Sequence, residues 1–159
     1  MYEKIIVPLD GSKVGEAALP YVEDLMSKLS PEVKVEVTLL RVLSELSHYM
    51  AVEMAGVSVP FTAKEMEQQN KEAMDYLDKA GEALRSKGAT VMAKVGVGDA
   101  CENIVKTAEE INANLIAMST HGRSGLSRWA FGSVTEKVLR REGRIPITVV
   151  KALKEAESA

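Results

Sequence analysis

The segment from Ser119 to Thr135 combines the residue types that bind phosphate groups in proteins. It follows an apolar run and holds three glycines, Gly122, Gly125 and Gly132, before a helical pattern begins. Glycines let backbone amides come close to an anion, and the first turn of a helix offers unpaired N–H groups at the positive end of its dipole. The segment therefore predicts a phosphate-sized anion site built without a lysine.

A purely structural interpretation of the same segment also stays open. Ser133 and Glu136 have the spacing of a capping box, and Gly125 fits an ordinary turn. Familiar phosphate motifs are missing, because the chain holds no GxxxxGK(S/T) P-loop and no GxGxxG after its first strand. Gly96 and Gly98 stand where a receiver-type phosphoacceptor would need an acidic residue.

The elements that must position this segment alternate along the chain. Five apolar runs predict strands over residues 4–9, 33–42, 89–97, 113–118 and 145–150. Helical spacing between them predicts helices over 14–29, 62–87, 99–111 and from residue 133 onward. Residues 43–61 carry no clear period and predict a long surface loop.

Several helix ends and interruptions are predicted from single residues. Thr62 and Asp99 are each followed by a glutamate three positions later, which is typical of an N-cap. Gly88 is expected directly after a helix C-cap. Pro20 lies inside the first helical pattern and predicts a kink or a local break there. Cys101 falls in a first helical turn, where we expect it to be buried.

This alternation predicts an α/β domain with an open five-stranded parallel sheet and helices on both faces. In such sheets ligands bind beyond the carboxyl ends of the strands, where the strand order reverses. The loops concerned follow Leu9, Val42, Val97 and Met118. At 159 residues the chain predicts one domain over residues 1–151 and a frayed tail over 152–159.

Composition and charge exclude several classes of protein. With Lys+Arg 20 against Asp+Glu 23, the net charge is -3, and 4% of residues are aromatic, so a nucleic-acid partner is not expected. Cys101 is the only cysteine, which excludes an intramolecular disulfide and a Cys-rich zinc site. Neither His48 nor His121 has ligand spacing suited to a metal.

The apolar run at 5–9 is too short for a signal or membrane segment, so we expect a cytoplasmic protein without membrane contact.

The basic residues gather in one part of the chain. Residues 119–144 hold six Lys or Arg against two Glu, although the whole chain is acidic. Some of these cations suit the C-terminal end of the last helix. Arg123 and Arg128 stand beside the glycines, so the basic segment matches the size of a single nucleotide.

Five motifs, in order and at suitable spacing, resemble the universal stress protein (UspA-like) family. They are IIVPLDGS at 5–12, VGVGD at 95–99, STHGRSG at 119–125, GSVTEKVL at 132–139 and IPITVV at 145–150. The nucleotide-binding branch of that family carries G-x2-G-x9-G-(S/T) after its fourth strand. Gly122, Gly132 and Ser133 fit this pattern. Ser119 stands at its first glycine, and only glycine is free to adopt a positive φ.

The resemblance implies a Rossmann-like sheet, similar to that of adenine-nucleotide alpha hydrolases, with strand order 3-2-1-4-5. It implies ATP, ADP or AMP at the switch point of strands one and four, held by loop 119–133, with Mg²⁺ carried on the phosphates. The residues implied near the base and ribose are Pro8, Leu9, Asp10, Val42, Met118, Ser119 and His121. Those implied around the phosphates are Gly122, Arg123, Gly132, Ser133, Val134 and Thr135. The strand from Ile145 to Val150 resembles the edge through which family members pair as homodimers.

Local alternatives remain for two of these residues. Asp10 also fits an Asx-turn or a cap for the first helix, and Val42 also fits simple core. No catalytic set accompanies the site, since Asp10 is the only candidate general base, so slow or absent ATP hydrolysis is expected.

Two functions stay open. The first is an ATP-binding stress or regulatory protein that is not an enzyme. The second is a dimeric interaction module of the UspA type that binds no nucleotide. An adenylate-forming or nucleotidyl-transfer enzyme is a third class, but the chain lacks a motif for a second substrate.

Overall fold

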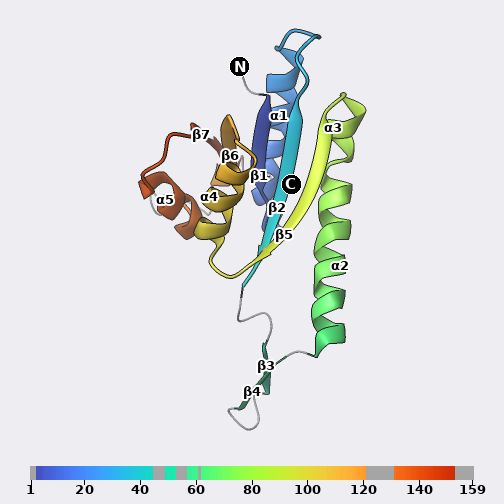
Figure 1. Cartoon of the computed structure of the whole chain (residues 1–159), viewed down its shortest axis with the longest axis vertical. Coiled ribbons are helices and arrows are strands. Elements are labelled where there is room, and N and C mark those ends of the chain that lie inside the picture. The colour runs from blue at the N-terminus through green and yellow to red at the C-terminus, as the bar shows by residue number, and fades with distance from the viewer. Residues whose placement is uncertain (1–2, 45–48, 53–56, 61, 121–130, 153–159) are drawn as a thin grey trace, which may run out of the picture.

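A five-stranded parallel sheet forms the centre of the molecule (Figure 1). The computed structural model describes residues 3–44, 49–52, 57–60, 62–120 and 131–152. The sheet strands are β1 (Lys4–Pro8), β2 (Glu36–Leu43), β5 (Thr90–Val97), β6 (Leu115–Thr120) and β7 (Ile147–Lys151). Their order is β5-β2-β1-β6-β7, which confirms the predicted order 3-2-1-4-5.

Helices cover both faces of this sheet, as predicted. They are the 3-10 turn η1 (Gly15–Ala17) and the helices α1 (Ala18–Ser27), α2 (Ala63–Ala80), α3 (Glu82–Ser86), α4 (Ala100–Glu110) and α5 (Ser133–Arg140). Helices α1, α2 and α3 supply Leu19, Leu77 and Leu84 to one hydrophobic cluster. Helices α4 and α5 supply Ile104 and Val138 to a second cluster on the other face.

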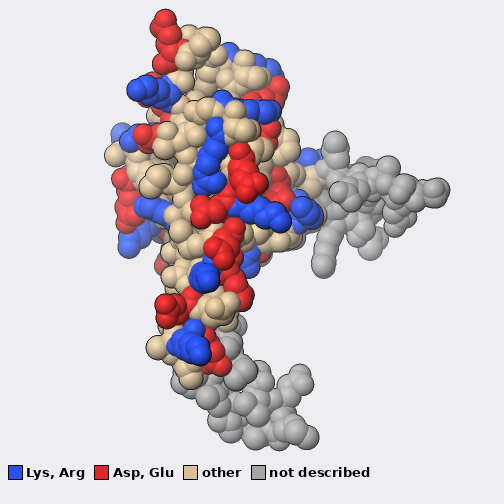
Figure 2. Space-filling view, turned by 90° about the vertical axis from the view of Figure 1, so that its right-hand side faces the viewer, with Lys and Arg blue, Asp and Glu red and all other residues tan. Residues whose placement is uncertain are grey.

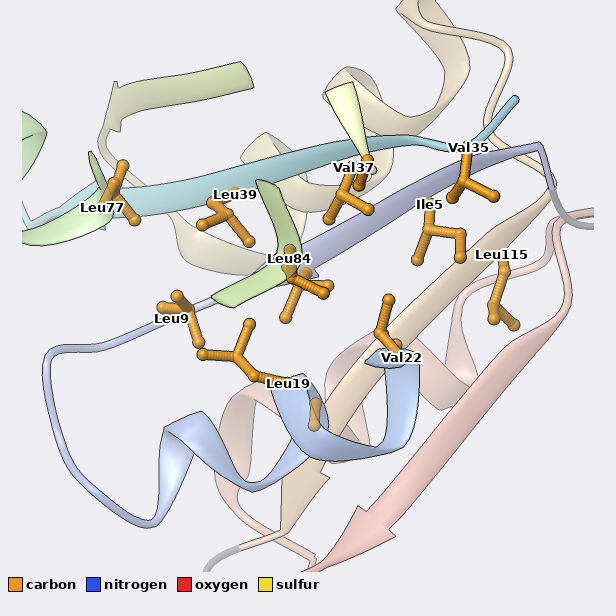
Figure 3. Packing of buried hydrophobic residues seen from close by; sticks show 14 residues of the cluster. Ile5, Leu9, Leu19, Val22, Val35, Val37, Leu39, Leu77, Leu84 and Leu115 are labelled. Carbon is orange, nitrogen blue, oxygen red and sulfur yellow. The ribbon is translucent and has the colours of Figure 1, made fainter. Parts of the chain in front are cut away.

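The strands divide their side chains between the two faces with a period of two. In β1, Ile5 and Val7 join the first cluster, whereas Ile6 joins the second. Strand β2 follows the same rule, with Leu39 in the first cluster and Leu40 in the second. In Figure 3, side chains of α1 and of the strands point toward one another across the first cluster. A sheet buried on both faces explains the nearly continuous apolar runs in the sequence.

The prediction of a loop over residues 43–61 is wrong. Leu43 still belongs to β2, and two further strands, β3 (Tyr49–Val52) and β4 (Val57–Pro60), pair antiparallel, with Tyr49 opposite Pro60. Each strand has only four residues, too few to display a period in the sequence. The pair forms a separate two-stranded sheet, seen at the foot of Figure 1.

Three predicted helix ends are confirmed. Thr62 and Glu65 form a capping box, and the Asp99 side chain accepts a hydrogen bond from the backbone N–H of Glu102. Gly88, with φ of +94°, follows the C-cap of α3, because the predicted helix over 62–87 divides at Gly81 into α2 and α3.

Two predictions in these helices change. Gly132, not Ser133, is the N-cap of α5, and this residue provides no side-chain cap. The predicted helix over 14–29 divides just before Pro20 into η1 (Gly15–Ala17) and α1 (Ala18–Ser27), so the expected local break lies ahead of Pro20, which falls in the first turn of α1. First-turn N–H groups have no intrahelical partner, so the missing proton of proline breaks no bond there.

The surface of the α2 side carries both signs of charge. Figure 2 shows Lys and Arg side chains interleaved with Asp and Glu over this side, as expected for a solvated helix surface. Among the described residues, no helix is long and apolar enough to cross a membrane. Ala152, where the predicted tail begins, is buried beyond the end of β7.

Candidate functional site

A pocket opens at the carboxyl ends of β1, β2 and β6, next to the first turns of α4 and α5. The described residues enclose a volume of about 190 Å³ there. Its lining consists of Pro8, Leu9, Asp10, Gly15, Leu40, Val42, Ala100, Ile104, Met118, Ser119, Gly132, Ser133, Val134 and Thr135. Strands β1 and β6 are neighbours at the point where the strand order reverses, which is where open α/β sheets bind ligands.

The structure brings ten of the predicted site residues together around this pocket. They are Pro8, Leu9, Asp10, Val42, Met118, Ser119, Gly132, Ser133, Val134 and Thr135. The other three, His121, Gly122 and Arg123, lie outside the described residues. That a nucleotide contacts any of them stays a prediction.

Sequence reasoning missed four lining residues, namely Gly15, Leu40, Ala100 and Ile104. A signal existed for Leu40, because residues two apart on a strand share a face and Val42 was already implicated. A signal also existed for Ala100 and Ile104, which lie in the helix that follows the carboxyl end of β5. Gly15 carried no such signal, since its role depends on contacts made after folding.

The floor of the pocket is apolar. Leu40, Ile104 and Met118 are 2%, 1% and 4% exposed, and all three belong to the second hydrophobic cluster. Val42 packs against the same cluster and is half-buried. A flat apolar group, such as an aromatic ring, could cover this floor and remove it from water.

Asp10 occupies one corner of the pocket and also organises the loop that carries it. Its Oδ1 accepts hydrogen bonds from the backbone N–H of Ser12 at 2.9 Å and from the Ser12 hydroxyl at 2.6 Å. This is the Asx-turn that the sequence left open as an alternative. Gly15 approaches so closely that a Cβ on it would lie 2.5 Å from Asp10 Oδ1, so a larger residue there would displace the Asp10 carboxylate.

The opposite side of the pocket is the N-terminus of α5. Its N-cap, Gly132, has φ of -58° and ψ of 153°, and this glycine offers no side-chain cap to the first turn. Backbone N–H groups of a first turn point out of the helix end and carry a partial positive charge. Because residues 132–135 line the pocket, this end of the site suits an anion.

Ser119 lies between these two sides, at the end of β6. Its hydroxyl accepts a hydrogen bond from the backbone N–H of Ala18 at 2.9 Å and donates one to the carbonyl of Gly15 at 2.8 Å. Its own carbonyl accepts from Thr135 Oγ1 at 3.3 Å. Among the described residues, Asn112 is the one non-glycine with a positive φ, so the backbone at 119 does not require glycine.

A further group of residues supports the Asp10 loop from the other face of the sheet. The Arg41 guanidinium lies 5.4 Å from the centre of the Tyr76 ring and packs against Gly11, where a Cβ would collide with it. The Tyr76 hydroxyl donates to Glu16 Oε1 at 3.0 Å. Burial, and then the hydrogen bond to Glu16, raise the pKa of Tyr76 above its ordinary value. No pattern in the sequence predicts this group.

Cys101 is buried at 5% exposure in the first turn of α4, as predicted. Burial, together with the nearby charge of Asp99, raises the pKa of its thiol. Within the described ranges, no group of three His, Cys, Asp or Glu residues is placed to hold a metal ion.

Comparison with known proteins places these observations in a family. The sequence model of the Universal stress protein family matches residues 1–151. The chain is 33% identical to universal stress protein MJ0577 of Methanocaldococcus jannaschii over 160 residues, which cover 95% of this chain and 96% of that protein. A solved structure of the protein MJ0577 has a TM-score of 0.75 at 30% identity, covering 97% of this chain and 99% of that one.

A more distant solved structure holds a nucleotide. The structure of the universal stress protein from Archaeoglobus fulgidus in complex with dAMP has a TM-score of 0.63 and 20% identity, covering 94% of this chain and 98% of that one. At this identity the likeness shows a shared fold alone.

Proposed function

Since the chain belongs to the universal stress protein family, we propose that it is a regulatory or stress-response protein that binds an adenine nucleotide, namely ATP, ADP or AMP. The observation that carries this proposal is the pocket at the carboxyl ends of β1, β2 and β6. There an apolar floor, a carboxylate and an uncapped helix N-terminus surround one small volume.

The three parts of a nucleotide match the three parts of this pocket. The apolar floor of Leu40, Ile104 and Met118 suits the base. The N-terminus of α5 suits the phosphates, because its dipole and free amides favour negative charge. Asp10 repels phosphates but accepts hydrogen bonds from hydroxyl groups, so the ribose belongs at its corner. Mg²⁺ would arrive with the phosphates.

The relatives support an adenine nucleotide as the ligand. The Archaeoglobus fulgidus universal stress protein was solved with dAMP, and another universal stress protein was solved with cAMP. Both ligands contain an adenine base and a phosphate, the two groups that we assign to the floor of the pocket and to the N-terminus of α5.

We further propose that nucleotide binding, not turnover, is the activity of this protein. Asp10 is the one carboxylate among the lining residues, and its Oδ1 already holds the Ser12 turn. Hydrolysis should therefore be slow or absent. Steady-state turnover on the order of 1 per second or faster would contradict this.

We also propose that two copies pair through β7. Strand β7 is an edge of the sheet, and its Ile147 and Val149 are only half-buried in a single copy. Edge strands of this kind readily add another strand.

We propose the cytoplasm as the location of the protein. Its single cysteine is not needed for a disulfide, which fits a reducing compartment.

Calorimetric titration with AMP, ADP and ATP in the presence of Mg²⁺ tests the nucleotide proposal. We expect heat of binding and a rise in melting temperature, because a ligand at 100 times its Kd stabilises the folded state by about 2.7 kcal/mol. If millimolar nucleotide produces neither, the protein is the interaction module that binds no nucleotide.

A Gly132→Val variant tests which end of the pocket holds the phosphates. The backbone angles at Gly132 suit valine, so the variant adds bulk beside the first turn without straining the chain. We expect AMP to bind at least about tenfold more weakly, which is ~1.4 kcal/mol, while adenosine, without a phosphate, keeps its affinity. Gly143→Val is the matched control, because a Cβ at Gly143 meets no atom within 4 Å. Equal AMP affinity of the two variants would remove α5 from the site.

A further inference from the structure

We propose that Ser119 is a positioning residue whose hydroxyl ties the Asp10 loop to the end of β6 and so presets the shape of the nucleotide pocket. Serine is then the functional residue at this position, although the nucleotide-binding pattern of the family has glycine there. The inference rests on the proposed function, and it names the residue that organises that site.

The first ground is that Ser119 caps a helix to which it does not belong. Helix α1 receives no side-chain cap from its own N-cap residue, Ala17. The Ser119 hydroxyl accepts from the N–H of Ala18, the first residue of α1, at 2.9 Å, and these residues lie 101 positions apart in the chain. A first-turn N–H has no acceptor within its own helix. The Ser119 side chain on β6 therefore caps the N-terminus of α1.

The second ground is a continuous set of hydrogen bonds from Ser119 to Asp10. The same hydroxyl donates to the Gly15 carbonyl at 2.8 Å, and the Gly15 N–H donates to the Ser12 hydroxyl oxygen at 3.0 Å. The Ser12 hydroxyl in turn donates to Asp10 Oδ1 at 2.6 Å. Through two intermediate residues, the Ser119 hydroxyl thus fixes the carboxylate that we assign to the ribose.

The third ground is that the same residue also contacts the phosphate side. The Ser119 carbonyl accepts from the Thr135 hydroxyl at 3.3 Å, and Thr135 is a buried first-turn residue of α5. A glycine at 119 would keep this carbonyl contact and lose both bonds of the hydroxyl. Because the backbone at 119 has no positive φ, serine introduces no strain that glycine would relieve.

The deciding experiment compares the affinity for AMP of the wild type with that of Ser119→Gly and Ser119→Ala. Although Ser119→Gly restores the family pattern, we expect both variants to bind AMP roughly three- to tenfold more weakly, as for the loss of one or two partly buried hydrogen bonds. Thr107→Val is the matched control, because it removes a buried hydroxyl from α4 away from the pocket lining. Its AMP affinity should stay within about twofold of wild type. Equal or tighter binding by Ser119→Gly overturns the proposal.

A double-mutant cycle with Asp10→Ala, which removes the oxygen that Ser12 contacts, separates positioning from general stability. If Ser119 acts by placing Asp10, Ser119→Ala should lower AMP affinity much less in the Asp10→Ala background than in the wild type. A merely structural role for Ser119 would lower the melting temperature and leave the two effects on affinity additive, and that result also overturns the proposal.

Hydrogen exchange judges the contact independently of any ligand. Exchange of the Ala18 amide should be at least about tenfold faster in Ser119→Gly than in the wild type, because the amide loses its Ser119 acceptor and keeps only its contact with the Glu16 carbonyl. If the wild type binds no nucleotide, the proposed function fails and the Ser119 proposal fails with it as a statement about a nucleotide site. An unchanged Ala18 amide in a wild type that does bind would overturn the Ser119 proposal alone.

Discussion

The two faces of the sheet are covered to different extents. On one face, α1, α2 and α3 close over the strands, and Leu39, Leu77 and Leu84 are 0% exposed. On the other face, among the described residues, α4 and the short α5 leave a pocket at the carboxyl ends of the strands, so Leu40 and Ile104 belong to the core and to the pocket lining at once. The pocket thus lies where the cover by the described helices ends.

Neighbouring residues of one strand therefore serve different purposes. In β2, Leu39 contributes to the face covered by α1, α2 and α3 (the closed face), whereas Leu40 and Val42 line the pocket on the other face (the open face). Because alternate side chains on a strand point to opposite faces, mutations one residue apart should separate stability from ligand binding.

The largest change in the free energy of unfolding is expected from a mutation on the closed face. Leu84→Ala removes a fully buried side chain of α3 and should lower the free energy of unfolding by about 2–5 kcal/mol, since the packed surroundings cannot collapse into the cavity. Urea denaturation measures this loss. The AMP affinity of the folded protein should be unchanged, and a parallel loss of affinity would show that the two faces are not separable.

A mutation on the open face should change both the free energy of unfolding and the affinity for AMP. Ile104→Ala enlarges a pocket that already admits water, so its cost in unfolding free energy should be smaller, about 1–3 kcal/mol. It also removes part of the apolar floor that we propose for the base, so AMP should bind about tenfold more weakly. Measuring both quantities on this variant and on Leu84→Ala completes the comparison. A stability loss from Ile104→Ala equal to that from Leu84→Ala, with AMP affinity intact, would contradict it.

Features that neighbouring residues encode can be predicted from the sequence. Apolar runs indicate the strands, and a glutamate three positions later marks Thr62 and Asp99 as N-caps, so the fold and these helix ends are predictable. The N-cap of α5 was misassigned by one residue, because Gly132 and Ser133 are both acceptable caps and only the backbone geometry distinguishes them.

The contacts that shape the pocket join distant parts of the chain, and local patterns do not contain them. In the sequence Ser119 stands out only because it replaces a glycine of the family pattern, while its partners Gly15 and Ala18 lie 104 and 101 positions earlier. Arg41 was hidden inside an apolar strand, where its side chain faces the opposite side from Leu40 and Val42. Its contacts with Gly11 and Tyr76 exist only once the sheet has formed.

Arg41 provides a test of whether the closed face influences the pocket at all. Arg41→Met keeps an unbranched side chain but removes the charge over Tyr76 and the support behind Gly11. We expect AMP to bind about two- to fivefold more weakly, as for the loss of roughly 0.5–1 kcal/mol of cation–π interaction. Arg85→Met, which breaks the exposed pair with Asp78, is the control and should leave the affinity unchanged. If both arginine variants bind AMP like wild type, the Asp10 loop needs no support from the closed face.

The last and smallest effect is on the reactivity of Cys101, which reports how far the pocket opening extends beneath α4. Cys101 lies in the first turn of α4, where the helix dipole should favour the thiolate, yet burial raises its pKa. A raised pKa means a smaller thiolate fraction at any given pH, so labelling by a disulfide reagent at pH 8 should be slower in the folded protein than in urea. The labelling rate should rise only above the pH expected of an ordinary cysteine. Fast labelling of the folded protein at neutral pH would show that water reaches beneath α4. Slow labelling would place the boundary of the opening between Ala100, which lines the pocket, and Cys101, which is buried in the core.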